Sequence, residues 1–448
     1  MRSAALLAAL SLAGCATAQT ALPVNAPLTE AQPLEPLHAK ADTVVLAFSG
    51  GGARAAAFSL GVLQGLHDMK GADGEPLTDH VALITSVSGG SITAAYFGQH
   101  GDAGLDAFRA AYLDQNWTAD IHDDPVSPLN WLRAYRGGVN GPDRLADWLD
   151  THVFDGGSMR DMADADGPQI WINATELHNE TPFAFTPFYF DAICSDLSHV
   201  RIADAVAASM AVPLAFRPVV VGTYGDACHA PLPAWTQSTD RTASVLQRDT
   251  AQAFIAYRDP TRMRYLHLVD GGVLDNFGLS SLILARRTAT TPYAPLSEAD
   301  AVRLHRALFL VVNAEKGRID TWPQEAKGPS GAQVIGAVSD AQVDFSKREA
   351  YDTFADAARI WRTDLVNWRC GLSQADVLRL RGALDGWKCD DVQFTVDMIS
   401  FADLSPAQFA QLRAAPTRVS LPRDLIDALI AGGHQAVTQN AAAEALTH

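Results

Sequence analysis

Short runs of apolar and β-branched residues alternate along most of the chain with segments in which apolar residues recur every three or four positions. The short runs have the length of buried strands, and the three-to-four-residue spacing is that of one helix face. Regular alternation of the two favours a mainly parallel sheet, because parallel strands need crossover connections. We therefore predict an α/β fold, a three-layer α/β/α sandwich around this sheet. The predicted strands are Val44–Phe48, Val81–Val87, Ile170–Asn173, Val219–Val221, Tyr265–Val269, Leu308–Asn313 and Phe394–Ile399.

Composition excludes several classes of protein. The chain has 448 residues, of which 48% are hydrophobic and 19% charged, so it can bury a large core and is not largely disordered. Its 51 acidic and 34 basic residues give a net charge of −17 at pH 7, which leaves no basic footprint for nucleic acid. No internal apolar run reaches the length of a membrane span, so any link to a membrane must be an anchor.

The N-terminus has the pattern of an export signal. A basic residue precedes the apolar run Ala4–Ala13, which ends in Leu12-Ala13-Gly14-Cys15. This ending resembles the cleavage box of bacterial lipoproteins, which implies a signal peptide over residues 1–14 and acylation of Cys15. Ala16, in place of Asp, implies by the same resemblance an outer-membrane location facing the periplasm. The alternative is an ordinary signal peptide with a chance cysteine.

Residues 15–42 contain four prolines and little apolar periodicity. We predict that they form an extended, Pro-rich tether between the lipidated Cys15 and the folded domain.

Four cysteines remain beyond Cys15, and in an exported protein an even number suggests two disulfides. Three pairings are possible. We favour the neighbours in sequence, Cys194 with Cys228 and Cys370 with Cys389, since each pair would tie down one local loop. No CxxC or HExxH motif is present, so a zinc site is not indicated.

A glycine-rich turn follows the first predicted strand. Gly50-Gly51-Gly52 separates that strand from a helix-like segment, which places free N–H groups at a helix N-terminus. A dinucleotide site would need an acidic residue at the end of the next strand, but Val81–Val87 ends in serine. A phosphate loop would need Lys-Ser/Thr after the glycines. An oxyanion hole for a substrate carbonyl, or a tight turn without a ligand, remains possible.

A second turn places a serine between a strand and a helix. Ser86-Val87-Ser88-Gly89-Gly90 has the logic of the Gly-x-Ser-x-Gly nucleophile elbow, with Ser86 in place of the first glycine. A plain Ser-Gly turn is the alternative.

An aspartate closes a third strand. Asp270-Gly271-Gly272 follows Tyr265–Val269, and α/β enzymes bind ligands at such strand ends. Asp275 lies in the same loop and is the alternative carboxylate. We rank Asp270 first because it ends the strand directly.

Taken in order, these motifs resemble those of the patatin-like phospholipases, which carry a glycine oxyanion loop, a serine elbow and an Asp-Gly-Gly aspartate. The resemblance extends from about Val44 to Ala314. Other matching stretches are Asn173–Thr175, Ala208–Pro213 and Asp275-Asn276, and Met398–Ile430 is similar to the C-terminal stretch of bacterial, lipoprotein-like members.

The resemblance implies a membrane-anchored serine acyl hydrolase whose partner is a lipid or acyl-ester substrate, with no cofactor or metal. Ser88 would be the nucleophile and Asp270 the base, without a histidine. The N–H groups of Gly50, Gly51 and Gly52 would hold the oxyanion, and Arg54 would clamp that loop. Gly90, Gly271 and Gly272 would support the turns.

The hydrolase domain is predicted over residues 43–448, with the core motifs in 44–314 and a C-terminal extension over 315–448. Insertions are predicted at about 114–150 and 225–262. The first contains Trp117, Trp131 and Trp148 and is either a lid or, as we favour, a wrapped segment with buried tryptophans.

Two other functions remain open. One is a non-catalytic lipid-binding or envelope-assembly lipoprotein. The other is a Ser-His-Asp esterase in which His305 or His434, both following Asp270 in the chain, supplies the base.

Overall fold

The computed structural model describes residues 22–29, 32, 35–115, 135, 138–228, 231–238, 242–316, 322–324 and 326–448. The predictions on the signal peptide, Cys15, Trp117 and Trp131 lie outside these residues. The strands are β1 (Ala26–Pro27), β2 (Asp42–Phe48), β3 (Val81–Val87), β4 (Gln169–Glu176), β5 (Thr181–Ala184), β6 (Ser195–Asp196), β7 (Val219–Gly222), β8 (Tyr265–Asp270), β9 (Arg306–Asn313) and β10 (Gln393–Ser400). The α-helices are α2 (Ala53–Asp68), α3 (Gly89–His100), α5 (Pro142–His152), α6 (Met159–Ala163), α7 (Pro187–Ala192), α8 (Ile202–Ser209), α9 (Val245–Tyr257), α10 (Leu279–Arg287), α11 (Glu298–Arg303), α12 (Gly331–Cys370), α13 (Gln374–Arg381), α14 (Pro406–Leu412), α15 (Arg423–Thr438) and α16 (Ala441–Glu444).

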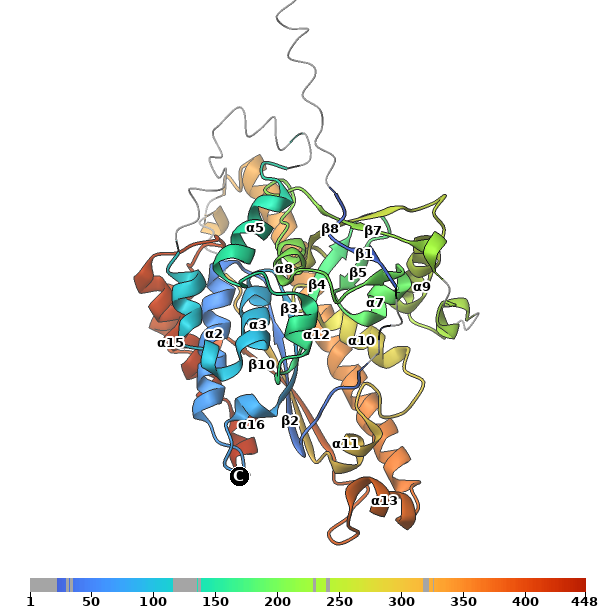
Figure 1. The fold of residues 1–448 in the computed structure, drawn as a ribbon. Coiled ribbons are helices and arrows are strands. Elements are labelled where there is room, and N and C mark those ends of the chain that lie inside the picture. The colour runs from blue at the N-terminus through green and yellow to red at the C-terminus, as the bar shows by residue number, and fades with distance from the viewer. Residues whose placement is uncertain are drawn as a thin grey trace, which may run out of the picture.

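The central sheet contains every predicted strand, in the order β10-β9-β2-β3-β4-β8-β7, with β5 paired to β4 (Figure 1). The run from β10 to β4 is parallel throughout. Beyond β4 the sheet is antiparallel, since β8 pairs antiparallel with both β4 and β7. The predicted mainly parallel α/β sandwich is therefore confirmed, with a mixed end at β8 and β7.

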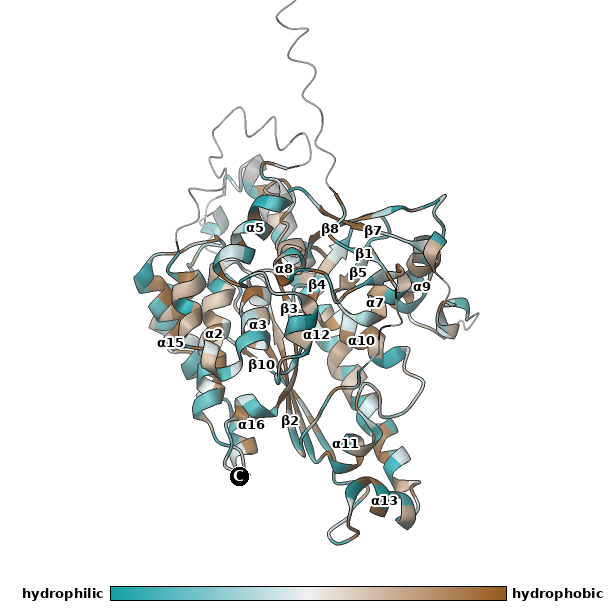
Figure 2. Ribbon diagram, in the orientation of Figure 1, coloured by the Kyte–Doolittle hydropathy of each residue, from teal (hydrophilic) through white to brown (hydrophobic). Residues whose placement is uncertain are grey.

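Helices cover both faces of the sheet (Figure 1). This is expected because successive residues of β2 point to opposite faces and are apolar on both. Val44, Leu46 and Phe48 belong to a core shared with α2, α3, α8 and α15. Val45 and Ala47 belong to a second core shared with α10, α11 and α12. Figure 2 shows the strands mostly in the hydrophobic colour, with hydrophilic positions on the outer helices.

The predicted C-terminal extension is part of this sandwich. β10 adds a parallel strand to β9, and α15 lies against α2. The two helices approach closely through glycines: a Cβ on Gly61 would lie 2.0 Å from the Ile430 carbonyl oxygen, and one on Gly433 would lie 2.1 Å from that of Phe58. The extension thereby fixes α2, the helix that follows the glycine loop.

The N-terminal segment before β2 is held more tightly than a tether. The Val24 N–H donates to the Val220 carbonyl at 3.0 Å, and Asn25 exchanges hydrogen bonds with Gly222 at 2.7 and 2.9 Å. β1 pairs with β6, and Leu37 bridges to Leu296. From Val24 to Pro27, and again around Leu37, the chain is therefore docked on the domain, unlike the extended tether predicted over residues 15–42.

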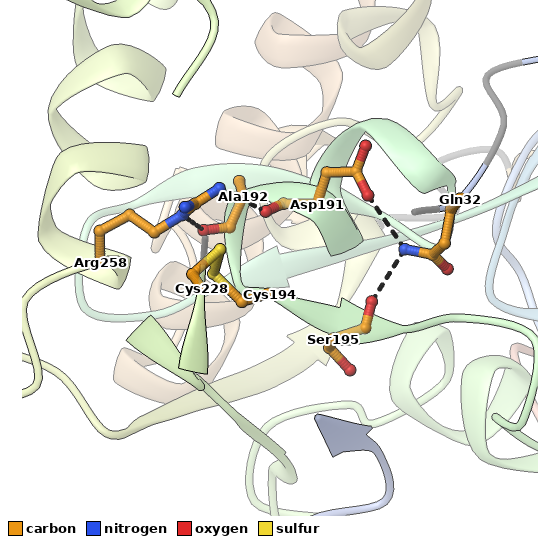
Figure 3. The surroundings of a disulfide bond; sticks show 7 residues. All are labelled: Gln32, Asp191, Ala192, Cys194, Ser195, Cys228 and Arg258. Carbon is orange, nitrogen blue, oxygen red and sulfur yellow. Dashed lines mark hydrogen bonds between the residues drawn. A yellow bond between two sulfur atoms is a disulfide. The ribbon is translucent and has the colours of Figure 1, made fainter. Parts of the chain in front are cut away.

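Both favoured disulfides are present, Cys194–Cys228 and Cys370–Cys389. Figure 3 shows the first, beside the docked N-terminal segment. There Gln32 donates to the Asp191 carboxylate at 3.1 Å and to the Ser195 carbonyl at 2.9 Å. Arg258 donates to the carbonyls of Asp191 and Ala192. The disulfide thus joins the loop that receives the N-terminal segment to the start of the second predicted insertion.

Of the tryptophans in the first predicted insertion, Trp148 is described. It is partly buried and packs against the core, with its ring 6.3 Å from that of Tyr112. Among the described residues, no helix is both long and apolar enough to cross a bilayer.

Candidate active site

Ser88 lies between the end of β3 and the start of α3, in a strained conformation. Its φ of 52° and ψ of −123° fall in a region that side-chain-bearing residues rarely adopt. Strain of this kind costs about 1–3 kcal/mol and persists only where neighbouring contacts fix it. The residue is 6% exposed and caps the N-terminus of α3, so the serine hydroxyl sits at the positive end of the helix dipole.

Asp270 ends β8 directly opposite Ala174 of β4. One of its carboxylate oxygens accepts the Gly272 N–H at 2.8 Å, and the Ser88 side chain lies close enough to the carboxyl to lower its pKa. Burial raises the pKa of Asp270 from 3.8 to about 6, although the hydrogen bonds from Gly272 and Ser88 oppose the shift. The two residues, 182 positions apart in the sequence, therefore lie at the same edge of the sheet.

The glycine loop faces the start of α3. A Cβ on Gly89 would lie 2.0 Å from the Gly52 carbonyl oxygen, so the peptide after Ser88 touches the loop. The Gly50 N–H donates to the Asn276 carbonyl at 3.2 Å. The N–H groups of Gly51, Gly52 and Gly89 have no acceptor in the part of the chain that the structure describes. Of the three N–H groups predicted to hold the oxyanion, that of Gly50 is therefore already bonded to Asn276, which leaves those of Gly51 and Gly52.

The supporting residues lie where close packing leaves no room for a side chain. A Cβ on Gly90 would be 2.7 Å from the Ser49 carbonyl oxygen, and one on Gly271 would be 2.6 Å from that of Asn173. One on Gly272 would be 2.6 Å from the Asn276 side-chain oxygen. These glycines let the three turns meet.

Arg54 is buried and hydrogen-bonds to three groups that are distant in the sequence. It is 3% exposed and donates to the Ala314 carbonyl at 2.6 Å, the Ala415 carbonyl at 2.9 Å and the Thr417 hydroxyl at 2.9 Å. Burial lowers its pKa to about 10, partly offset by the charge of Glu315. Arg54 therefore ties the first turn of α2 to the segment after β9 and to the C-terminal extension.

Ser209, at the end of α8, holds the Ser88 backbone. Its hydroxyl accepts the Ser88 N–H at 2.8 Å and donates to the Asn173 carbonyl at 2.6 Å. The Asn173 side chain in turn donates to the Thr85 hydroxyl and the Ser86 carbonyl. One sequence signal points to these residues, since both fall in the stretches Asn173–Thr175 and Ala208–Pro213 that match the family pattern.

Ser86 and Asp275 have structural roles. Ser86 replaces the first glycine of the elbow, and its hydroxyl donates to the Trp171 carbonyl at 3.2 Å, so the substitution leaves no unpaired polar group. The Asp275 carboxylate accepts the N–H groups of Phe277, Gly278 and Ser280 at 2.6–3.1 Å. It organises the turn before α10, which leaves Asp270 as the carboxylate at the serine.

The candidate histidines lie elsewhere. His305 is 3.1 Å from Asp391 and immediately precedes β9, at the amino end of the parallel strands, whereas Ser88 follows the carboxyl end of β3. His434, on α15, is 2.9 Å from Asp68. Each therefore has an acidic partner away from Ser88.

Comparisons with known proteins agree with the motifs. The family model described as patatin-like phospholipase matches residues 46–283, a range that includes the glycine loop, Ser88 and Asp270. No curated protein matches the chain by sequence.

Among solved structures, the chain is similar to human GIVD cytosolic phospholipase A2, with a TM-score of 0.43 and 14% identity. The match covers 91% of this chain and 59% of the human protein, so the chain spans less than two thirds of that length. It is also similar to VipD from Legionella pneumophila, with a TM-score of 0.26 and 12% identity over 95% of this chain and 73% of VipD. A match to the ExoU–SpcU complex of Pseudomonas aeruginosa has a TM-score of 0.21 and 13% identity over 83% and 80% of the two chains. Because the family model matches more than half of its residues, the chain belongs to the patatin-like phospholipase family.

Proposed function

We propose that the chain is a membrane-anchored serine acyl hydrolase that uses a Ser88–Asp270 dyad on a lipid ester. The observation that carries the proposal is the proximity of the Ser88 side chain to the buried Asp270 carboxyl, whose pKa it lowers. A serine hydroxyl is a weak nucleophile at neutral pH and needs an adjacent base. With its pKa raised to about 6, the carboxyl is mostly ionised at pH 7 yet more basic than an exposed aspartate.

In the first half of the proposed reaction, the Ser88 oxygen attacks the ester carbonyl and its proton moves to Asp270. The resulting oxyanion is held by the N–H groups of Gly51 and Gly52, which have no acceptor within the described residues. Collapse of the intermediate breaks the bond to the alcohol, which leaves with the proton from Asp270. An acyl group then remains on Ser88.

In the second half, water attacks the acyl-serine and gives a proton to Asp270. The bond between the carbonyl carbon and the Ser88 oxygen breaks, and that oxygen recovers the proton. A free carboxylic acid is released. Membership of the patatin-like phospholipase family supports a lipid acyl ester as substrate, so phospholipase A, lysophospholipase and lipid esterase activity are the proposed forms of this reaction.

Labelling with a fluorophosphonate tests the dyad, because the reagent reacts only with an activated serine. We expect labelling of the parent chain, none of Ser88→Ala, and strong slowing in Asp270→Asn. His305→Ala and His434→Ala serve as matched controls and should hydrolyse a soluble ester at the parent rate. A folded chain that is not labelled at Ser88 would favour the non-catalytic lipoprotein, and loss of turnover in either histidine variant would favour the Ser-His-Asp esterase.

Acylation of Cys15 is the second part of the proposal. The lipoprotein-like box at Leu12–Cys15 supports it, and so do the two disulfides, which are typical of exported proteins. Growth with a clickable fatty acid should label the parent chain in the outer-membrane fraction and leave Cys15→Ser unlabelled. Equal labelling of the two chains would remove the anchor from the proposal.

A further inference from the structure

Exposed apolar side chains gather around the edge of the sheet that carries Ser88 and Asp270. Phe345, Val338 and Val334 are exposed on one side of α12, at the spacing of a single helix face. Val273 is exposed in the turn after Asp270, and Leu214 is exposed beyond the end of α8. We call these five residues the apolar rim.

Contacts along α12 place its first half beyond the catalytic edge. Ser346 donates to the Leu274 carbonyl, in the loop that follows Asp270. From there the helix descends along the sheet, since Arg362 donates to the Val392 carbonyl and Arg369 to the Leu304 carbonyl, both at the amino ends of strands. The residues before Ser346 therefore continue in the opposite direction, and Val334 lies about 18 Å further along the axis.

Hydrogen bonds of neighbouring residues place the other two members of the rim, Leu214 and Val273, near the site. The Asp270 N–H donates to the Ala211 carbonyl at 3.0 Å, so the turn that carries Leu214 begins beside the dyad. Val273 lies three residues after Asp270, next to the carbonyl that Ser346 contacts. The rim thus borders the catalytic edge from two sides.

The described chain begins at this same end. β8 runs toward the catalytic edge and ends there at Asp270, so its partner β7 runs away from that edge, beyond the site. Val24 is bonded to β7, and Leu22, two residues earlier, is 81% exposed (Figure 1). Leu22 is only seven residue steps from Cys15, which limits the reach between them to about 25 Å at full extension.

We propose that the apolar rim is a docking surface for a lipid bilayer, which sets the catalytic edge against the membrane. The proposal rests on the proposed lipid substrate and anchor. A chain acylated at Cys15 and docked at Val24 has too short a reach to present the opposite end, where α13 lies (Figure 1). The net charge of −17 favours a zwitterionic lipid surface over an anionic one.

Matched residues on the opposite end provide the control. Ile360, in the second half of α12, is 62% exposed, against 59% for Phe345. Leu378, on α13, is 51% exposed, against 56% for Val338. Members of each pair have similar exposure and similar apolar character, so membrane contact is the property that separates them.

The test uses the full chain purified from cells, with Ser88→Ala to prevent hydrolysis, bound to phosphatidylcholine vesicles. A polarity-sensitive fluorophore is attached in turn to Phe345→Cys, Val338→Cys, Ile360→Cys and Leu378→Cys, while the cysteines of the two disulfides remain paired. We expect blue-shifted emission, and quenching by nitroxide lipids at least threefold stronger, for the two rim labels than for the two controls.

Three results would overturn the proposal. They are rim fluorophores whose emission stays typical of water when the chain is bound to vesicles, equal quenching at rim and control positions, or absence of vesicle binding. Rim labels that are shielded before vesicles are added would instead indicate a second copy of the chain as occupant, which also overturns it. Because Ser88→Ala is inactive under the proposed function, the outcome is independent of whether the dyad hydrolyses lipid. Failure of the docking surface and failure of the hydrolase are therefore distinguishable.

Discussion

Gly89→Ala tests whether the start of α3 and the glycine loop form one oxyanion site. The new Cβ would lie 2.0 Å from the Gly52 carbonyl oxygen and 2.7 Å from the Gly52 nitrogen. Cβ contacts below 3.0 Å essentially do not occur, and both of these Gly52 atoms belong to the backbone, so the loop or the helix start must move. The required shift is roughly 1 Å, a displacement that can cost about 10²-fold in rate.

Gly89→Ala keeps every N–H group but displaces the oxyanion donors, so the known cost of losing one donor sets the upper limit of the effect. Such a loss typically lowers kcat by about 10²–10³, or about 2.7–4 kcal/mol of transition-state stabilisation. Overpacking of this kind also destabilises a fold by about 1–3 kcal/mol, which a thermal melt records separately. We therefore expect Gly89→Ala to remain folded, with a slightly lower Tm and a kcat on a water-soluble ester reduced by about two orders of magnitude.

Gly336→Ala is the matched control, because Gly336 lies within α12 and its Cβ would meet no atom within 4 Å. Alanine there should stabilise the helix by about 0.5–1 kcal/mol and leave kcat unchanged. If Gly89→Ala is folded and turns over within threefold of the parent rate, then Gly51 and Gly52 do not hold the oxyanion in the arrangement described.

Three further predictions follow from the site. Since burial raises the pKa of Asp270 to about 6, kcat/KM should rise with pH through about 6. The same shift makes the ionised carboxylate destabilising above that pH, so Asp270→Asn should be inactive yet have a higher Tm than the parent at pH 8, with a smaller gain toward pH 4. An unchanged Tm at pH 8 would contradict this. Ser209→Ala removes the acceptor of the Ser88 N–H and should slow fluorophosphonate labelling by about tenfold; labelling at the parent rate would exclude Ser209 as a positioning residue. Arg54→Met leaves buried carbonyls without a donor and should lower the free energy of unfolding by about 3 kcal/mol in urea titrations, whereas a loss below about 1 kcal/mol would rule out the clamp.

Hydrophobic patterning predicted the sheet well, because each strand has apolar residues on both faces and is bounded by turn residues. Val44–Phe48 and Val81–Val87 are almost entirely buried in β2 and β3. The apolar pattern of β8 does not predict whether the strand runs parallel or antiparallel to its neighbours. Its direction follows from the pairing of β8 with β7 across the second insertion, a contact set by tertiary packing.

The docking of the N-terminal segment on the domain could not be predicted from hydrophobic periodicity. Its docking combines bonds of backbone groups and of two amides, those of Asn25 and Gln32, with isolated apolar contacts of Val24 and Leu37, and it has no periodic apolar face. Such bonds do not recur at the period of a helix or strand. Residues before β2 therefore have the composition of a linker, although they are fixed to β7 and to the loop around Cys194.

The same limit applies within the site and explains why Ser88 was easier to predict than the residues that hold it. The motif Ser86–Gly90 identifies a strained turn, but strain of about 1–3 kcal/mol must be offset by contacts that come from elsewhere in the chain. Here Ser209 supplies an acceptor for the Ser88 N–H and is itself bonded to Asn173, which also bonds to the end of β3. Each hydrogen bond contributes about 1 kcal/mol, so the network is of the size needed to balance the strained serine. A single altered side chain in it should therefore relax the turn before it unfolds the domain.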